Sequence, residues 1–385
     1  MSDGPAGASL RGASDVARLH DCPGTGVVVV TGGGSGALEA LLSVPGASRT
    51  LLEARVPYAP NALTEWLGGD PDRACDPETA RAMAMAAYRR ARHLDPEGAR
   101  FGVACTASLI TNRPKRGEHR VHVALQTAAA THLWSLVLDA GARTRGEEEA
   151  VCVALVLNAV AEGKGLGTIR TPEVRDSEML VEERHEGTPH WQNLLHDRAR
   201  ATRHTFAHAP PGETRRRPVF PGAFNPVHEG HLEMARVASE IVGAPTEFEI
   251  CVRNVDKPPL NYADIERRTR LFDAEAIIWL TAAPTFAEKA ELFPGAVFVV
   301  GVDTLARIAE PRYYGDDPVA RDAAMETIAA NGCTFLVFGR LVDETFLGLE
   351  DLDLPDSVAR LAEGVAEHRF RVDLSSSSLR RNRPW

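Results

Sequence analysis

The segment 221–231, PGAFNPVHEGH, constrains the fold of this 385-residue chain more than any other stretch. Apolar Val219 and Phe220 precede it and the helical run LEMARVASEIV follows it, so it is a predicted turn between a strand and a helix. A glycine lets the backbone approach a polyphosphate, and His228 and His231 are spaced to face one way at the helix start. A single histidine there would indicate a solvated cap, but the joint pattern predicts a mononucleotide-binding unit.

The same residues fill a GxFxPxHxGH pattern that resembles the signature of the nucleotidylyltransferase superfamily. The resemblance implies that His228 and His231 are catalytic and contact the transferring phosphate. It also implies a nucleotide-binding loop, made of Gly222, Ala223, Phe224, Asn225 and Gly230. In this superfamily the attacking group is often a phosphate that is already an anion, so the protein positions two substrates and neutralises charge at the α-phosphate.

The chain ends with a serine-rich run, DLSSSSLR at 373–380, that resembles the ISSTxIR motif of the same superfamily. Leucine replaces isoleucine twice, and Ser377 stands where threonine is usual. Taken alone, such a run would indicate disorder. With the first motif it implies a β- and γ-phosphate clamp, in which Arg380 is catalytic and supplies a charged fork and the serines bind phosphate: Ser375, Ser376 and Ser377.

Between the two motifs, apolar strands alternate with helical patterns, which predicts a Rossmann-like, doubly wound parallel sheet of the HUP type. Gly301 and Asp303 end the run AVFVVGVD, where mononucleotide adenylyltransferases of this superfamily contact the adenosine. A plain strand-to-helix turn with Asp303 as N-cap is the alternative. Lys257 falls in a loop after the second strand, where it is either a phosphate contact or a solvated side chain.

The N-terminal half reads as a second α/β domain, residues 25–167. Its TGG turn and the run SVPGASRTLLEARVPYA are similar to the C-terminal domain of the CinA family, whose active members deamidate nicotinamide mononucleotide. Val29 and Leu63 occupy the positions of the family's serine nucleophile and lysine, so a non-catalytic domain is predicted. Nucleotide binding by 31–35 and the basic loop 112–116 stays open, beside a tight turn and a solvated hairpin.

Composition narrows the classes of partner. The net charge of −10, from 43 basic and 53 acidic residues, disfavours a nucleic-acid partner. The sequence also lacks the KMSKS-like loop of the class I aminoacyl-tRNA synthetases, which disfavours that class of enzyme. No segment is apolar and long enough to span a bilayer, so no membrane partner is predicted. The six cysteines lack CxxC spacing, which predicts a cytoplasmic protein with no metal site. The remaining segments are a predicted flexible leader, 1–24, and a linker with one short helix or strand pair, 168–216, before the nucleotidylyltransferase domain, 217–385.

The whole arrangement resembles a plant and bacterial family that shares the stretches RPKRGEH at 113–119 and KAELFPG at 289–295. The leading hypothesis is an enzyme of NAD metabolism that transfers an adenylyl group from ATP, with Mg²⁺, to a phosphorylated acceptor such as a pyridine mononucleotide. The tryptophan that often stacks on the pyridine ring is missing, and Tyr313 or Tyr314 is the substitute. A cytidylyltransferase, a pantetheine-phosphate-type transferase and a nucleotide-binding regulator without turnover stay open, as does a homo-oligomer.

The serine-rich run generates a first prediction. Arg380→Ala weakens binding of ATP at least tenfold more than binding of AMP, because the guanidinium would meet only the β- and γ-phosphates. Calorimetric titration with both ligands measures this, and Arg383→Ala, three residues further on, is the control. Equal losses for ATP and AMP would remove the phosphate clamp from this segment.

Overall fold

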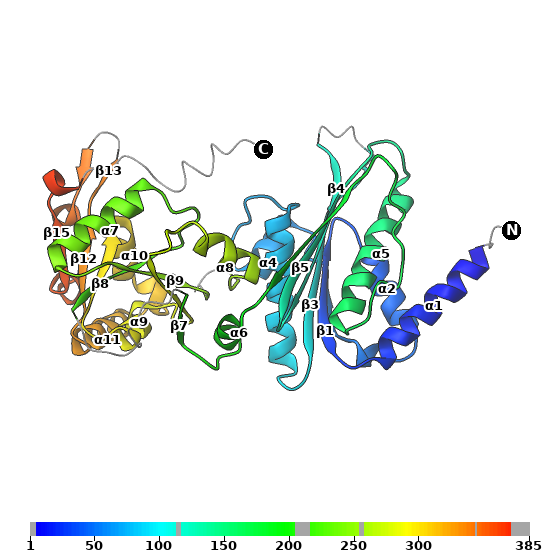
Figure 1. Cartoon of the computed structure of the whole chain (residues 1–385), viewed down its shortest axis with the longest axis horizontal. Coiled ribbons are helices and arrows are strands. Elements are labelled where there is room, and N and C mark those ends of the chain that lie inside the picture. The colour runs from blue at the N-terminus through cyan, green and yellow to red at the C-terminus, as the bar shows by residue number, and fades with distance from the viewer. Residues whose placement is uncertain (1–4, 113–116, 205–215, 254–257, 343–344, 371–385) are drawn as a thin grey trace. The chain divides into compact units, whose positions relative to one another are not determined.

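The computed structural model describes residues 5–112, 117–204, 216–253, 258–342 and 345–370 (Figure 1). The chain divides into two compact units. The N-terminal unit comprises Met1–Gln192 and Asp256–Asp264, and the C-terminal unit comprises Asn193–Val255 and Ile265–Trp385.

The N-terminal unit contains a mixed six-stranded sheet in the order β2-β1-β3-β4-β5-β6. Strand β1 pairs in parallel with β2 and β3, and the remaining neighbours pair antiparallel. The strands are β1 (Thr25–Thr31), β2 (Leu51–Arg55), β3 (Arg100–Ser108), β4 (His119–Thr127), β5 (Ala130–Leu138) and β6 (Leu180–Glu186). The helices are α1 (Pro5–Asp21), α2 (Ser35–Ser43), α3 (Pro60–Leu67), α4 (Pro77–Leu94), α5 (Arg145–Gly163) and α6 (Pro189–Leu195).

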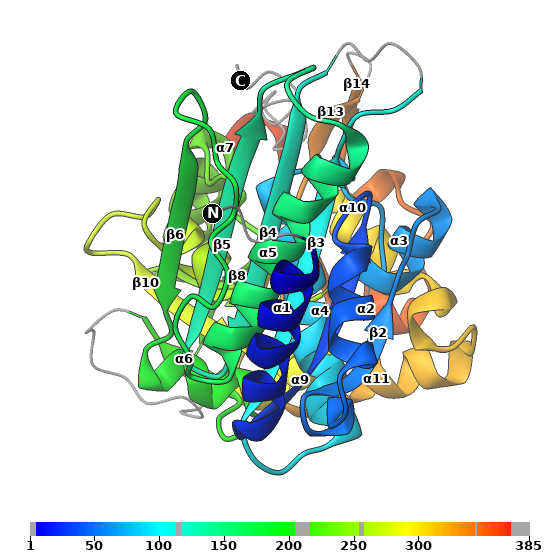
Figure 2. The same ribbon diagram turned by 90° about the vertical axis from the view of Figure 1, so that its right-hand side faces the viewer.

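Helices cover both faces of this sheet (Figures 1 and 2). Successive strand residues point to opposite faces, so Val28 and Val30 pack in one core with α1, α2 and α5. Val27 and Val29 pack in the other core with α3 and α4. A strand buried on both faces reads as a continuous apolar run, which explains the GVVVV pattern at 26–30.

Two segments differ from the sequence-based expectation. Residues 5–21 of the expected flexible leader form α1, whose Val16 and Leu19 lie in the core. Strand β6, within the expected linker, pairs with β5 over seven residue pairs. Four consecutive residues of this strand, 181–184, are exposed, so the sequence shows no alternation of apolar and polar residues. The strand forms because it pairs with β5, not because it has an apolar face.

The C-terminal unit contains a seven-stranded sheet in the order β15-β12-β11-β8-β9-β10-β7. All neighbours pair in parallel except β7, which is antiparallel to β10. The strands are β7 (Ala201–Arg203), β8 (Arg217–Pro221), β9 (Glu247–Cys251), β10 (Ile277–Thr281), β11 (Ala296–Gly301), β12 (Thr334–Phe338) and β15 (Ala362–Val365); β13 (Arg340–Val342) and β14 (Thr345–Leu347) form a separate pair. The predicted doubly wound parallel sheet is confirmed.

The helices of this part of the chain are α7 (Glu229–Val242), α8 (Tyr262–Thr269), α9 (Phe286–Leu292), α10 (Val302–Ala309), α11 (Pro318–Ala330) and α12 (Asp356–Ala359). Val219 of β8 packs with residues of α9, α10 and α11 on one face. The next residue, Phe220, contacts Phe224 and Phe248 on the opposite face. Within the described ranges, no helix has the length and apolar character needed to cross a membrane.

Candidate functional site

The GxFxPxHxGH segment lies where the strand order of the C-terminal sheet reverses. Strand β8 sits between β9 and β11, and the chain winds outward from it through β9 and β10 on one side and through β11, β12 and β15 on the other. The loop 222–228 follows β8 and Gly301 ends β11, so both lie at the carboxyl edge of neighbouring parallel strands. Open α/β sheets bind ligands at this switch point.

Gly222 and Phe224 fix the path of the loop. The Gly222 N–H donates to the Glu249 carbonyl of β9 at 2.9 Å. A Cβ on Gly222 would lie 2.5 Å from the ring of Phe224, so only glycine fits. Phe224 is buried with φ of +42° and its ring lies 5.3 Å from those of Phe220 and Phe272, centroid to centroid. Aromatic packing thus holds the loop against the sheet.

The two histidines meet at the N-terminus of α7. His228 is the N-cap residue, and its ring stacks on that of His231 at 3.7 Å between centroids. The Phe224 and His231 rings pack in a T-shaped arrangement at 5.1 Å between centroids, and the His228 backbone N–H donates to His231 Nδ1 at 3.3 Å. The structure therefore brings together the predicted pair.

Burial sets the charge of this pair. It lowers the pKa of His231 to about 4, with the positive charge of His228 adding to the effect, and burial also lowers the pKa of His228. The His231 imidazole is thus neutral at pH 7. Because its Nδ1 accepts a hydrogen bond, we assign the ring proton to Nε2, which is then a donor for an anionic ligand.

Sequence reasoning missed two arginines of α8 that bind the loop. Arg267 donates to Asn225 Oδ1 at 2.5 Å, and Arg268 donates to the Ala223 carbonyl at 2.9 Å. Their signal was the run ERRTR at 266–270, but nothing in the sequence pairs it with a loop some 40 residues earlier. These guanidinium groups place positive charge beside two predicted nucleotide-binding residues.

Asp303 is engaged by a further residue that the sequence did not indicate. Gly301 is the N-cap of α10, so the N-cap alternative for Asp303 is wrong. The Asp303 carboxylate forms an ion pair with Arg340 of β13, and both side chains are about half exposed. Arg340 follows β12 as Asp303 follows β11, which explains their proximity at one edge of the parallel sheet.

The structure does not test five of the predicted site residues. Lys257, Ser375, Ser376, Ser377 and Arg380 lie outside the described residues.

The two substitute tyrosines are both engaged. Arg307 and Arg312 lie over the Tyr313 ring at 5.4 and 4.8 Å from its centroid. The Tyr314 hydroxyl donates to the Ile308 carbonyl at 3.1 Å. Arginines thus lie over the Tyr313 ring, and the partly buried Tyr314 packs against the apolar core.

In the N-terminal unit, Val29 and Leu63, the two residues on which the sequence resemblance predicts a non-catalytic domain, lie in the core. Val29 in β1 is 0% exposed and Leu63 in α3 is 3% exposed. Both belong to the apolar cluster between the sheet and α4. Neither the residue type nor the location supplies an attacking group or a base.

The glycine-rich turn after β1 is filled by a carboxylate of α5. Glu149 accepts from the backbone N–H of Gly34 at 2.9 Å and of Gly36 at 3.1 Å, and from the Ser35 hydroxyl at 3.1 Å. These N–H groups stand at the N-terminus of α2 and would otherwise be the donors for a phosphate. Residues 113–116 of the basic loop, which the sequence analysis considers for nucleotide binding together with this turn, lie outside the described residues.

No group of three or more His, Cys, Asp or Glu side chains in the described ranges has the arrangement of a metal site.

Residues 219–382 match the family model described as Cytidylyltransferase-like, which spans less than half of the chain. The C-terminal part thus contains a cytidylyltransferase-like domain, as the sequence motif predicts. No curated protein matches the chain significantly.

Solved structures similar to this chain include a CinA superfamily protein and two competence- or damage-inducible proteins. A competence-damaged protein (CinA) superfamily protein from Escherichia coli shares 15% identity over 42% of this chain and 93% of its own, with a TM-score of 0.31. The competence/damage-inducible protein CihA from Agrobacterium tumefaciens shares 20% identity over 42% of this chain and 96% of its own, with a TM-score of 0.31. A competence or damage-inducible protein from Enterobacter asburiae shares 15% identity over 43% and 98%, with a TM-score of 0.30.

The occupied glycine-rich turn generates a second prediction. Glu149→Ala removes the acceptor of the Gly34 and Gly36 amides, so their hydrogen exchange accelerates, and inorganic phosphate restores their protection by taking the vacated position. Hydrogen exchange of the full chain with and without phosphate measures this. Glu39→Ala, at an exposed position of α2, is the control for loss of charge. If phosphate protects these amides equally in the unaltered chain, Glu149 does not occupy an anion site.

Proposed function

We propose that the chain is a nucleotidyltransferase that transfers an adenylyl group from ATP to a pyridine mononucleotide and releases pyrophosphate. The observation that carries the proposal is the neutral, stacked pair of His228 and His231 at the N-terminus of α7, at the switch point of a parallel sheet. The cytidylyltransferase-like match over the same residues supports the reaction class.

The reaction requires the protein mainly to position the two substrates and to stabilise negative charge. The acceptor phosphate attacks the α-phosphorus as an anion, the bond to the β-phosphate oxygen breaks, and pyrophosphate leaves. The Nε2–H of His231 donates to a non-bridging α-phosphate oxygen, where negative charge grows in the transition state. The partial positive charge of the 14-residue helix α7 acts on the same oxygens.

The supporting charges come from α8 and from the substrate metal. Arg267 and Arg268 of α8 donate to the loop that follows β8 and favour a polyanion there. Mg²⁺ would enter with the triphosphate, held by phosphate oxygens and water, and would neutralise charge on the leaving pyrophosphate.

Cytidylyl transfer from CTP is the second candidate, because the matching family is described as Cytidylyltransferase-like. The reaction at phosphorus is the same, so the two differ only in how the base is recognised. Pyrophosphate release with each nucleotide and nicotinamide mononucleotide separates them, and we expect ATP to be at least tenfold more effective.

For the N-terminal unit we propose a non-catalytic role. The support is the burial of Val29 and Leu63 in one apolar cluster.

The third prediction concerns the histidine pair. His231→Ala lowers the rate of pyrophosphate release about 100- to 1000-fold, the loss expected for one preorganised transition-state donor. A continuous pyrophosphate assay with ATP and nicotinamide mononucleotide measures it, and the melting temperature reports whether the variant is folded. His368→Ala, at an exposed position of the same unit, is the control. Unchanged turnover in the His231 variant would remove this residue from the mechanism. ATP binding without pyrophosphate release from the unaltered chain would favour a regulator.

The fourth prediction concerns deamidation. The full chain releases no ammonia from nicotinamide mononucleotide above the buffer rate, because valine and leucine can neither form nor activate an acyl-enzyme. An enzyme-coupled ammonia assay measures this. Ammonia release at any rate that scales with protein concentration would contradict the non-catalytic assignment and would direct mutagenesis to Ser35, Thr31 and Ser108.

A further inference from the structure

The N-terminal unit contains a cavity of about 530 Å³ that none of the chemistry above uses. It lies among the second half of α5, the loop that follows this helix, and strands β5 and β6. Trp134, Leu166 and Leu180 contribute apolar surface, while Glu162, Glu182 and Arg184 contribute charge. The volume falls within the range of small-molecule sites.

The loop wall of the cavity is fixed by the protein itself. Gly165 has φ of +75°, and its N–H donates to the Glu162 carbonyl at 2.9 Å while the Leu166 N–H donates to Ala161 at 2.8 Å, which ends α5. The Asn158 side chain then holds the next part of the loop, accepting from the Ile169 N–H at 3.0 Å and donating to the Arg170 carbonyl at 2.7 Å. A preformed wall lowers the ordering cost of binding.

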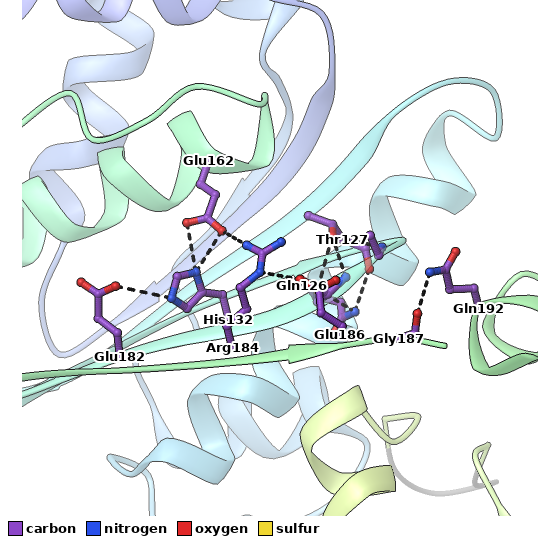
Figure 3. A network of polar contacts seen from close by, with 11 residues as sticks. Gln126, Thr127, His132, Glu162, Glu182, Arg184, Glu186, Gly187 and Gln192 are labelled. Carbon is purple, nitrogen blue, oxygen red and sulfur yellow. Dashed lines mark hydrogen bonds and ion pairs between the residues drawn. The ribbon is translucent and has the colours of Figure 1, made fainter. Parts of the chain in front are cut away.

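The charged residues of the cavity, Glu162, Glu182 and Arg184, belong to a polar network that also contains His132 and Glu186 (Figure 3). His132 Nδ1 lies 2.9 Å from Glu162 Oε1, and Arg184 binds both Glu162 and Glu186. Burial acts to raise the pKa of Glu162, but the hydrogen bond and charge of His132 and the charge of Arg184 outweigh it, so this pKa is below its usual value. Glu162 and the guanidinium are therefore occupied with each other.

Glu182 differs from Glu162 in its availability. Its Oε2 lies 3.7 Å from His132 Nε2, beyond hydrogen-bond distance, and its side chain is 54% exposed. This leaves a carboxylate at the cavity with room for a donor.

Trp134 supplies an aromatic surface next to this carboxylate. The residue is 6% exposed, lines the cavity, and packs its ring against that of His132 at 3.8 Å between centroids. The indole therefore forms an aromatic part of the cavity wall, and Trp134 pairs with Glu182 across β5 and β6.

We propose that this cavity binds a small planar organic cation, an aromatic or unsaturated ring that bears an amidinium or ammonium group. The ring lies against Trp134, Leu166 and Leu180, and the cationic group binds the Glu182 carboxylate. An anion is disfavoured because Arg184, the one Lys or Arg among the described residues that line the cavity, already binds two carboxylates. This site is separate from the proposed transferase site and does not depend on it.

Benzamidine, benzamide and benzoate test the proposal, because they have nearly one shape and carry positive, zero and negative charge. Calorimetric titration of the full chain is expected to show one saturable site for benzamidine and at least tenfold weaker binding of the other two. Glu182→Gln is expected to lower benzamidine affinity at least tenfold, the scale of one lost charged hydrogen bond. Benzamidine is also expected to change the tryptophan fluorescence, and less so in Trp134→Phe.

Glu183→Gln is the matched control, since it removes the same charge from the next residue of β6, which points to the opposite face and pairs with Arg81. Its affinity for benzamidine is expected to equal that of the unaltered chain. Equal binding of benzamidine and benzamide, tighter binding of benzoate, or unchanged affinity in Glu182→Gln would each overturn the proposal. Pyrophosphate release is measured alongside and is expected to be the same in all three variants, so a failure here is distinct from a failure of the transferase assignment.

Discussion

The reversal of strand order at β8 is the constraint on which the candidate transferase site depends. Because β9 and β11 flank β8, their carboxyl ends bring the histidine loop and Gly301 to one edge. Glu249 of β9 fixes this edge twice. Its carbonyl accepts from Gly222, and its buried carboxylate binds Lys289 at 2.8 Å. Loss of either partner would leave a buried charge unpaired, which costs about 3–5 kcal/mol, so the ion pair is a stronger requirement than its net stabilisation suggests. Lys289 begins the KAELFPG stretch, which therefore has a structural role behind the loop.

Each unit contains a glycine turn before a helix, but the groups at the two helix N-termini differ in charge. Each turn follows a strand that pairs in parallel with both neighbours and leads into a helix N-terminus. In the N-terminal unit the donors hold the Glu149 carboxylate, so the turn is satisfied without a ligand. In the C-terminal unit the helix begins with two imidazoles whose pKa values are lowered by burial. Because neutral imidazoles do not offset the positive potential of the helix N-terminus and of the nearby arginines, this potential can attract an incoming polyanion. The difference explains why only the second turn supports a proposal of catalysis.

The sequence predicts most strands and helices because they carry strong local patterns, such as GVVVV in β1 and AVFVV in β11. It fails where pairing or distant contacts decide. Strand β6, LVEERHE, has no apolar alternation, and its one neighbour β5 supplies the ladder. Helix α1 differs from the expected flexible leader because Val16 and Leu19 pack in the core and His20 is buried, contacts that no strong local pattern in the sequence indicates. The histidine pair followed from a motif, whereas Arg267, Arg268 and Arg340 reach the site from other elements, and no local pattern encodes such contacts.

The burial of Val29 and Leu63 sets what a polar substitution at either position would cost the N-terminal unit. Both side chains lie in one apolar cluster, at 0% and 3% exposure. A serine at position 29 would bury a hydroxyl there, at a cost of about 1–3 kcal/mol unless it gains a partner. A lysine at position 63 would bring an ammonium toward the same cluster, where the neutral form is favoured. Each substitution alone would destabilise the core. The packing of α3 and α4 against β1 therefore favours apolar side chains at positions 29 and 63, and a ligand of this unit would contact surfaces away from those two positions.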